Sequence, residues 1–166
     1  MIDLLSEKPF EDITINEIVS KAQLSRTAYY NHFVSKEDIL CSYVTEIANH
    51  YLRIPPSDYP NYLISDEFYK SLIFMFNDND TFFTLIKKRN IWYVIEKEMY
   101  NIFYARIGDM DHYINYYGFK RENIRYYVHC LMNAIIGLLF HWIKYTERET
   151  PEEFLNIFKI IRRTSI

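Results

Sequence analysis

The chain has 166 residues, enough for one large domain or for a small domain followed by a medium one. Hydrophobic residues make up 49% and charged residues 25%, as in an ordinary globular protein, while 3 glycines and 5 prolines are too few for a β-sandwich or an α/β fold. We therefore expect an all-α protein. The formal net charge of −3 argues against nucleic-acid binding through overall charge. Neither a secretory leader nor an apolar run of about 18 residues is found, which predicts a cytoplasmic protein that does not enter a membrane.

The N-terminal residues carry helix signals in close succession. Residues 1–10 have the pattern of an apolar helix end that Pro9 closes. Thr14 and Glu17 form a capping box, in which each side chain bonds to the backbone amide of the other residue. An apolar stripe at helical spacing follows, so we expect a second helix that runs to about Ala22.

A short helix and a longer one come next. Ser25 is placed to cap a helix that runs to about Phe33, after a connection of about three residues. Ser35 opens the longer helix, which Pro55 and Pro56 end. Two short helices joined by a tight turn and backed by a third helix are typical of a helix-turn-helix.

The second part of the chain is also predicted to be helical. A loop at residues 55–65 precedes it, and a polar, Tyr-rich connection interrupts it at 108–119. The expected helices span roughly residues 66–77, 81–89, 91–107 and 121–146, and a last one begins at Thr150.

The second helix of a helix-turn-helix enters the major groove of DNA, so it must present small or polar side chains outward. Arg26 has the reach to bind a guanine edge through two hydrogen bonds, and Asn31 can do the same for adenine. Thr27 is small enough to permit close approach. Tyr29 and Phe33 are four residues apart and are expected to anchor the helix inward.

The string from Ile13 to Glu37 resembles the DNA-binding domain of the TetR family of bacterial repressors. The run Tyr-x-His-Phe-x-Ser-Lys-Glu at residues 30–37 is its most specific part. The resemblance covers roughly residues 1–50 and implies a DNA-binding domain there, with a helical regulatory and dimerisation domain at 51–166. The base contacts that it implies are Arg26, Thr27 and Asn31. The phosphate contacts that it implies are Thr14, Ser25, Tyr30, His32 and Lys36.

Two features depart from the pattern of the family. Gln23 occupies the turn position where the family usually has Gly, and Gln adopts the required geometry only at a cost. The first helix of the family is longer and often follows a basic arm, so we expect Met1 to be an internal methionine of a longer native chain.

The charge of the N-terminal part is unfavourable for DNA. Residues 1–50 contain four basic and eight acidic side chains. Arg26 and Lys36 nevertheless lie near the predicted reading face, and phosphate attraction is local and screened. We expect modest non-specific affinity for DNA.

The last two predicted helices form an αα-hairpin. Two such hairpins from two subunits make a four-helix interface, and Ala134 and Gly137 are small enough for close helix approach. Residues 120–163 resemble the subgroup of the family that includes regulators of dihydroxyacetone kinase genes, which implies architecture and no particular ligand. The expected residues of the homodimer interface are Tyr127, Leu131, Ala134, Gly137, Leu138, Phe154 and Phe158.

The aromatic residues of the middle helices permit a pocket for a small-molecule effector. Trp92, Tyr93 and Phe103 are the candidates, although core packing explains them as well. The basic run at residues 87–89 is expected to be a solvated helix end that complements the helix dipole. We expect no metal and no cofactor. The sequence contains neither a nucleophile–base pair nor a glycine-rich phosphate loop. Among the classes of function considered, an enzyme is therefore the least favoured.

Two hypotheses follow from these patterns. The first is a dimeric repressor that binds a near-palindromic double-stranded DNA operator and releases it when an effector binds among the middle helices. The second is a TetR-like protein that has lost DNA binding and acts as a protein-interaction adaptor, which the acidic character of residues 1–50 motivates.

Overall fold

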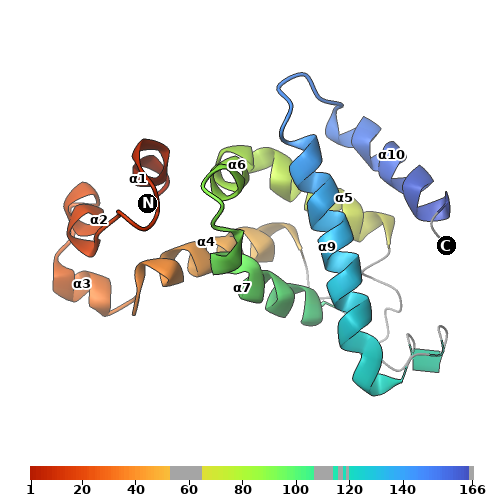
Figure 1. The fold of residues 1–166 in the computed structure, drawn as a ribbon, viewed down its shortest axis with the longest axis horizontal. Coiled ribbons are helices and arrows are strands. Elements are labelled where there is room, and N and C mark those ends of the chain that lie inside the picture. Colours follow the sequence, from red (N-terminus) through yellow and green to blue (C-terminus); the bar gives the residue numbers. More distant parts are fainter. Residues whose placement is uncertain (53–64, 107–113, 116–117, 119, 165–166) are drawn as a thin grey trace.

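The computed structural model describes residues 1–52, 65–106, 114–115, 118 and 120–164. Within these ranges the chain forms helices and no strand, which confirms the all-α fold with an N-terminal helix-turn-helix (Figure 1). Most of the predicted loop at 55–65 and of the connection at 108–119 lies outside the described residues. The elements are α1 (Ile2–Glu7), α2 (Ile15–Lys21), α3 (Arg26–Tyr30), α4 (Lys36–Tyr51), α5 (Asp66–Asp78), α6 (Asp80–Lys88), α7 (Trp92–Tyr104), the 3-10 turn η2 (Arg121–Asn123), α9 (Ile124–Trp142) and α10 (Pro151–Thr164).

The helices form two connected groups. In Figure 1, α1, α2 and α3 lie together at one end of the molecule, and α4 leads from them into the second group. There α4 packs against α5 and α7, α9 packs against α6 and α7, and α10 packs against α5. The predicted domain boundary at residue 50 falls in the last turn of α4, so this helix connects the two groups rather than belonging to one.

Side-chain caps start the helices where the sequence predicts them. At α2 the Thr14 hydroxyl accepts the Glu17 N–H at 3.3 Å, and the Glu17 carboxylate accepts the Thr14 N–H at 2.9 Å. A second capping box opens α4 at Ser35. Such bonds satisfy N–H groups that the first turn of a helix leaves without a partner. Thr150 and Glu153 form a third capping box at the start of α10, and single side-chain caps are present at Ser25 and Ser65.

Two helices end earlier than predicted. α3 stops at Tyr30 instead of Phe33. The His32 N–H donates to the Tyr29 carbonyl, three residues back, and this 3-10 type of bond tightens the chain and ends the helix. α9 starts at residue 124 and ends at Trp142, inside the predicted range of 121–146. The Trp142 indole Nε1–H donates to the Glu149 carbonyl at 3.0 Å, which folds the link to α10 back onto the end of α9.

The turn between α2 and α3 contains Gln23 in the left-handed region, with a φ of 55°. Gln23 N–H donates to the Ser20 carbonyl at 3.2 Å, and Leu24 N–H donates to the Val19 carbonyl at 2.9 Å. This pair of bonds is a Schellman motif, which needs a left-handed residue at this position. The structure therefore confirms that the turn imposes a conformation that glycine adopts most easily.

A second Schellman motif ends α6 at Asn90, with a φ of 56°. Asn90 N–H donates to the Lys87 carbonyl at 3.1 Å, and Ile91 N–H donates to the Ile86 carbonyl at 3.0 Å. Asparagine tolerates this conformation better than most residues with a side chain. The turn holds α6 and α7 close together at this point.

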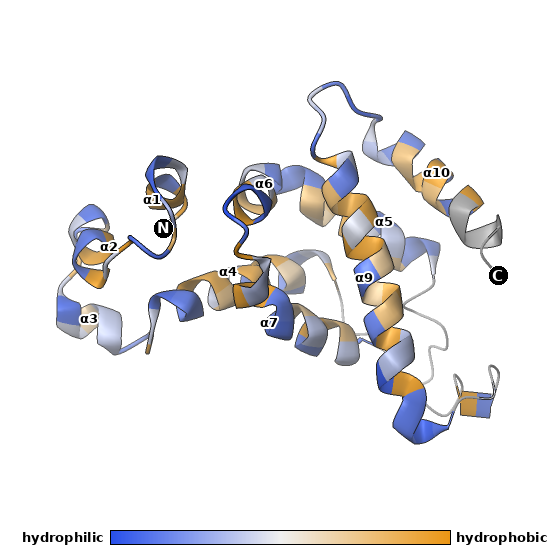
Figure 2. Cartoon of the chain, in the orientation of Figure 1, coloured by the Kyte–Doolittle hydropathy of each residue, from blue (hydrophilic) through white to orange (hydrophobic). Residues whose placement is uncertain are grey.

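Aromatic rings fill the core of the second group. Phe76 of α5 stacks on Phe83 of α6 with ring centroids 3.8 Å apart, and Phe140 of α9 meets Phe76 edge-on at 5.6 Å. Phe158 of α10 covers Tyr69 of α5 at 4.7 Å. In Figure 2 the helices of this group carry hydrophobic residues, whereas the link between α9 and α10 is hydrophilic.

Arg106 ties the C-terminal end of α7 to the C-terminal end of α4. Its side chain is buried, and its guanidinium donates to the Leu52 carbonyl through Nε at 2.9 Å and Nη2 at 2.7 Å. It also donates to the Ile102 carbonyl at 2.9 Å and to the Asn49 side chain at 3.2 Å. These bonds satisfy carbonyl groups at both helix ends.

We predict that Gln23→Gly stabilises the protein by about 0.5–1 kcal/mol, because relief of the left-handed strain exceeds the entropy that glycine adds to the unfolded chain. Urea unfolding at neutral pH measures this difference. Asn90→Gly is the matched control at the same position of the other Schellman motif, and a smaller gain is expected there. Equal effects at the two positions, or a loss at Gln23, would contradict the prediction.

Candidate nucleic-acid interface

α3 is anchored by Tyr29, whose side chain is 3% exposed. The Tyr29 ring lies 5.1 Å from the ring of Tyr30 and 5.8 Å from that of Phe33, which is itself half-buried. The prediction that Tyr29 and Phe33 point inward agrees with this packing. Of the other residues in this five-residue helix, Arg26, Thr27 and Tyr30 are exposed and Ala28 is half-buried.

The exposed face of α3 carries the side chains predicted to read bases. Arg26 and Thr27 are exposed on the helix, and Asn31 is exposed at its C-cap. Tyr30, predicted to contact phosphate, is 54% exposed on the same short helix, and His32 is exposed just after it. The structure therefore brings these five predicted residues together at one surface.

Two further predicted phosphate ligands are exposed but already hydrogen-bonded. The Ser25 hydroxyl accepts the Ala28 N–H at 3.0 Å as the cap of α3. The Thr14 hydroxyl donates to the Glu17 carboxylate at 2.8 Å within the capping box. A phosphate oxygen needs a donor, and the Ser25 hydroxyl, which accepts in this bond, still has its proton to donate. To bind a phosphate, the Thr14 hydroxyl would have to give up its hydrogen bond to the Glu17 carboxylate and donate to a phosphate oxygen instead.

Lys36 has different partners from those predicted. Its Nζ donates to the carbonyl oxygens of Phe10 at 2.6 Å, Glu11 at 3.0 Å and Ile13 at 3.0 Å. The ammonium group also lies 4.5 Å from the centroid of the Phe10 ring. All three ammonium protons thus have acceptors within the protein, so none remains for the predicted phosphate. The acceptors lie 23 to 26 residues away in the chain, which is why no local pattern revealed them.

The other lysines of residues 1–50 form ion pairs inside the protein. Lys8 pairs with Glu17, and this contact together with the Thr14 N–H lowers the pKa of the Glu17 carboxyl to about 2. Lys21 pairs with Glu7 at 2.7 Å, and the Glu7 carboxylate raises the pKa of Lys21. These pairs neutralise the lysines by which this part of the chain would otherwise attract phosphate.

Arg26 is consequently the one Lys or Arg side chain of residues 1–50, all of which the structure describes, without a hydrogen-bond or ion-pair partner. A guanidinium in this state can present its planar donors to a base edge or a phosphate. The charge that this surface offers a polyanion is therefore concentrated at the first residue of α3.

Arg89 links this part of the molecule to the second group of helices. It follows α6 directly, and its guanidinium donates to the Leu5 carbonyl at 2.7 Å and to the Ser6 carbonyl at 2.9 Å. Both carbonyls belong to the last turn of α1, where a helix leaves such groups without partners. The basic run at 87–89 was expected to be a solvated helix end rather than a contact surface, so the sequence did not indicate this contact within the chain.

The three residues predicted to line an effector pocket do not surround one cavity. Trp92 lines a cleft of about 260 Å³ between the α6–α7 turn and α9. Tyr93 is 62% exposed at the surface of α7. Phe103 is fully buried and packs edge-on against Phe68 at 5.5 Å. Of the three, Trp92 alone borders this cleft.

Some residues of the predicted dimer interface are exposed and others are buried. Ala134 and Gly137 are exposed on α9. Phe154 and Phe158 are instead buried within the chain, where Phe154 stacks on Trp142 at 4.7 Å, so these two do not form an outer surface. The helical period identified the apolar face of α10 but not the elements that cover it. Half-buried positions on α9 are Tyr127, Leu131 and Leu138. Large exposed hydrophobic residues that the prediction missed are Tyr126, Tyr145, Ile157 and Ile160.

Over the residues that the structure describes, no three His, Cys, Asp or Glu side chains gather as a metal site would require. None of the described helices combines the length and the apolar character needed to cross a bilayer.

Two family models match the chain. The model described as "Bacterial regulatory proteins, tetR family" matches residues 2–42. The model described as "Transcriptional regulator C-terminal region" matches residues 65–163, which is more than half of the chain. Neither match identifies the dihydroxyacetone kinase regulator subgroup, so that resemblance stays a prediction. No curated protein and no solved structure matches the chain.

We predict that Lys36→Met destabilises the protein by about 2 kcal/mol, since three carbonyls lose a charged donor while the aliphatic stem is retained. Urea unfolding measures the loss. Lys97→Met, at an exposed position of α7, is the control and should change stability by less than about 0.5 kcal/mol. Unchanged stability with weaker DNA binding would favour the phosphate contact that the sequence predicted.

Proposed function

Since the chain belongs to the tetR family of bacterial regulatory proteins and is thereby a DNA-binding transcriptional regulator, we propose that it is a homodimeric repressor whose DNA affinity a small effector controls. The observation that carries this proposal is the exposed face of α3, with Arg26 free of partners beside Thr27 and Asn31. Residues 1–50 form the DNA-binding part in this proposal, residues 51–166 form the regulatory and dimerisation part, and the protein acts in the cytoplasm.

The proposed contacts with DNA follow from chemistry and exposure. Arg26 binds a guanine edge through two parallel hydrogen bonds, and Asn31 binds adenine in the same manner. Thr27 lies between them on the exposed face and has no bulk to hold the helix away from the groove. The residues proposed to contact phosphate are Thr14, Ser25, Tyr30 and His32. Lys36 acts indirectly, because it fixes the connection before α2 against the start of α4.

The proposed dimer forms through the outer faces of α9 and α10. Exposed Ala134 and Gly137 let a second α9 approach closely, with half-buried Leu138 beside them. Ile157 and Ile160 of α10 add exposed apolar surface, which a soluble monomer rarely leaves uncovered. A two-fold axis through this surface would place the two α3 helices on successive half-sites of a near-palindrome. The resemblance to the dihydroxyacetone kinase regulator subgroup is part of the same proposal for this hairpin.

One observation favours a second candidate function, a protein-interaction adaptor without DNA binding. Three of the four lysine and arginine side chains in residues 1–50 are engaged inside the protein, which leaves little positive charge for phosphates. We prefer the repressor, since α3 retains polar and small side chains that a protein-binding surface does not need. The two functions differ in whether a specific DNA fragment exists.

We predict that fluorescence anisotropy against genomic fragments selects a specific operator at moderate salt. Arg26→Ala should weaken binding of that operator by about 1–3 kcal/mol per half-site and relax its sequence preference. The slope of log K against log salt should be shallow, below about 4 in magnitude, because each subunit brings few cations to phosphates. Lys97→Ala is the control, remote from α3 and without effect. Failure to select any specific fragment would overturn the repressor and favour the adaptor.

For the dimer, we predict that Ala134→Glu raises the dissociation constant by about 30-fold or more, because each subunit would bury a carboxylate without a partner. Glutamate is a good helix former, so the monomer should stay folded. Sedimentation equilibrium measures the change, and Thr84→Glu at an exposed position of α6 is the control. A chain that is monomeric before any substitution would contradict the proposed interface.

A further inference from the structure

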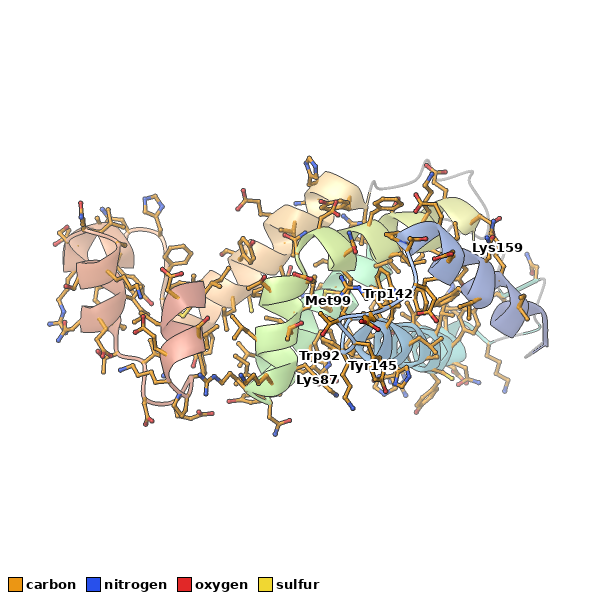
Figure 3. The ribbon with its side chains drawn as sticks, turned by 90° about the horizontal axis from the view of Figure 1, so that it is seen from above. Lys87, Trp92, Met99, Trp142, Tyr145 and Lys159 are labelled. Atoms are coloured by element: carbon orange, nitrogen blue, oxygen red, sulfur yellow. The ribbon has the colours of Figure 1, made fainter. Side chains whose placement is uncertain are left out.

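A cleft lies where the turn between α6 and α7 meets α9. It has a volume of about 260 Å³, and both α6–α7 and α9 contribute to its walls. In Figure 3, Lys87 and Trp92 lie close together at the junction of α6 and α7. Ligand pockets for drug-sized molecules are usually about 300–1,000 Å³, so this cleft suits a smaller molecule.

Two aromatic rings form one side of the cleft. Trp92 meets Phe140 edge-on, with ring centroids 5.3 Å apart. Gly137, which the proposed dimer interface also uses, lies beside them on α9. Within the single chain, a Cβ atom at this position would meet no atom outside its own stretch of helix within 4 Å. The aromatic wall and the open position next to it leave room for a planar ring.

Among the described residues that line the cleft, Lys87 is the one cation and none is a carboxylate. Lys87 is exposed in the last turn of α6, and its Nζ lies 5.3 Å from the centroid of the Phe140 ring. In the part of the chain that the structure describes, no carboxylate lies within ion-pair distance of Lys87. Lysine residues elsewhere do find such partners, as Lys159 does with Asp66 at 3.0 Å. An ammonium beside aromatic faces and free of a counter-ion is suited to bind an organic anion.

Asn133 adds a fixed polar group to the same cleft. Its amide nitrogen donates to the Tyr100 hydroxyl at 3.0 Å and to the His129 carbonyl at 2.8 Å. Both amide protons are therefore used, and the oxygen remains as an acceptor. A ligand with a hydroxyl or ring N–H beside its ring can donate to this oxygen.

We propose that this cleft binds a small aromatic carboxylate, with its ring against Trp92 and Phe140 and its carboxylate paired with Lys87. This inference rests on the proposed effector response and names the site and the ligand class for it. The same turn of α6 leads to Arg89, which holds the last carbonyls of α1. A ligand that joins Lys87 to α9 therefore acts on the segment that contacts the DNA-binding part, and bound ligand changes operator affinity.

The test measures ligand binding first, without DNA. Isothermal titration with benzoate and with indole-3-carboxylate should give saturable binding of at least one of them. Lys87→Met should weaken it about tenfold or more, as expected for loss of a charged hydrogen bond. Lys88→Met removes the same charge from the next position of α6 and should change binding less than about twofold, because Lys88 does not line the cleft. The corresponding carboxamides should also bind about tenfold more weakly.

Urea unfolding of both variants checks that each is folded. Absence of saturable binding for both carboxylates, equal weakening by the two lysine substitutions, or equal binding of the carboxamides would overturn the site. The operator assay is then repeated with saturating ligand. Binding without any change in operator affinity would retain the ligand site and overturn its link to α1. Ligand binding by a chain that selects no operator would retain the site and overturn the repressor.

Discussion

The placement of α3, the helix that we propose reads DNA, depends on the ammonium group of Lys36. Its three protons bond to carbonyls of residues 10, 11 and 13, so the connection before α2 is fixed against the first turn of α4. α3 lies between these two helices in the chain and is only five residues long, too short to hold its own position. Tyr29 completes the anchorage from the inside. These two supports fix the orientation of α3. Its other face, which carries Arg26, Thr27 and Asn31, is therefore exposed.

The same contacts determine how such a surface can recognise DNA. Lysines that pair with Glu17 and Glu7, or with carbonyls, stabilise the protein but no longer attract phosphate over a distance. In the function that we propose, recognition then depends on close hydrogen bonds made after the surfaces meet, with the guanidinium of Arg26 as the main charged group. A regulator that works as we propose gains little from non-specific binding and would obtain its affinity from sequence readout and from the proposed second subunit.

Local features were predictable from the sequence, and contacts between distant segments were not. The capping boxes at Thr14 and Ser35 join residues three apart, so spacing alone reveals them. The strained geometry at Gln23 was indicated by the resemblance to the TetR family, which usually has Gly at that position. Lys36 and Arg89 find their acceptors 23 to 26 and 83 to 84 residues away, and no spacing rule encodes such pairs. Phe154 and Phe158 show a third case. Their period identifies an apolar face, but only packing determined that α5 and α9 cover it.

Arg106 gives α4 a fixed far end, just as Lys36 gives it a fixed near end. α4 has 16 residues and is therefore about 24 Å long. By simple geometry, a tilt of about 5° at the Arg106 end moves the Lys36 end by roughly 2 Å over that length. A hydrogen bond between a side chain and a base edge is lost over a smaller displacement than this. A small movement at the base of α4 is thus large enough, at its tip, to make or break the base contact that we propose for Arg26.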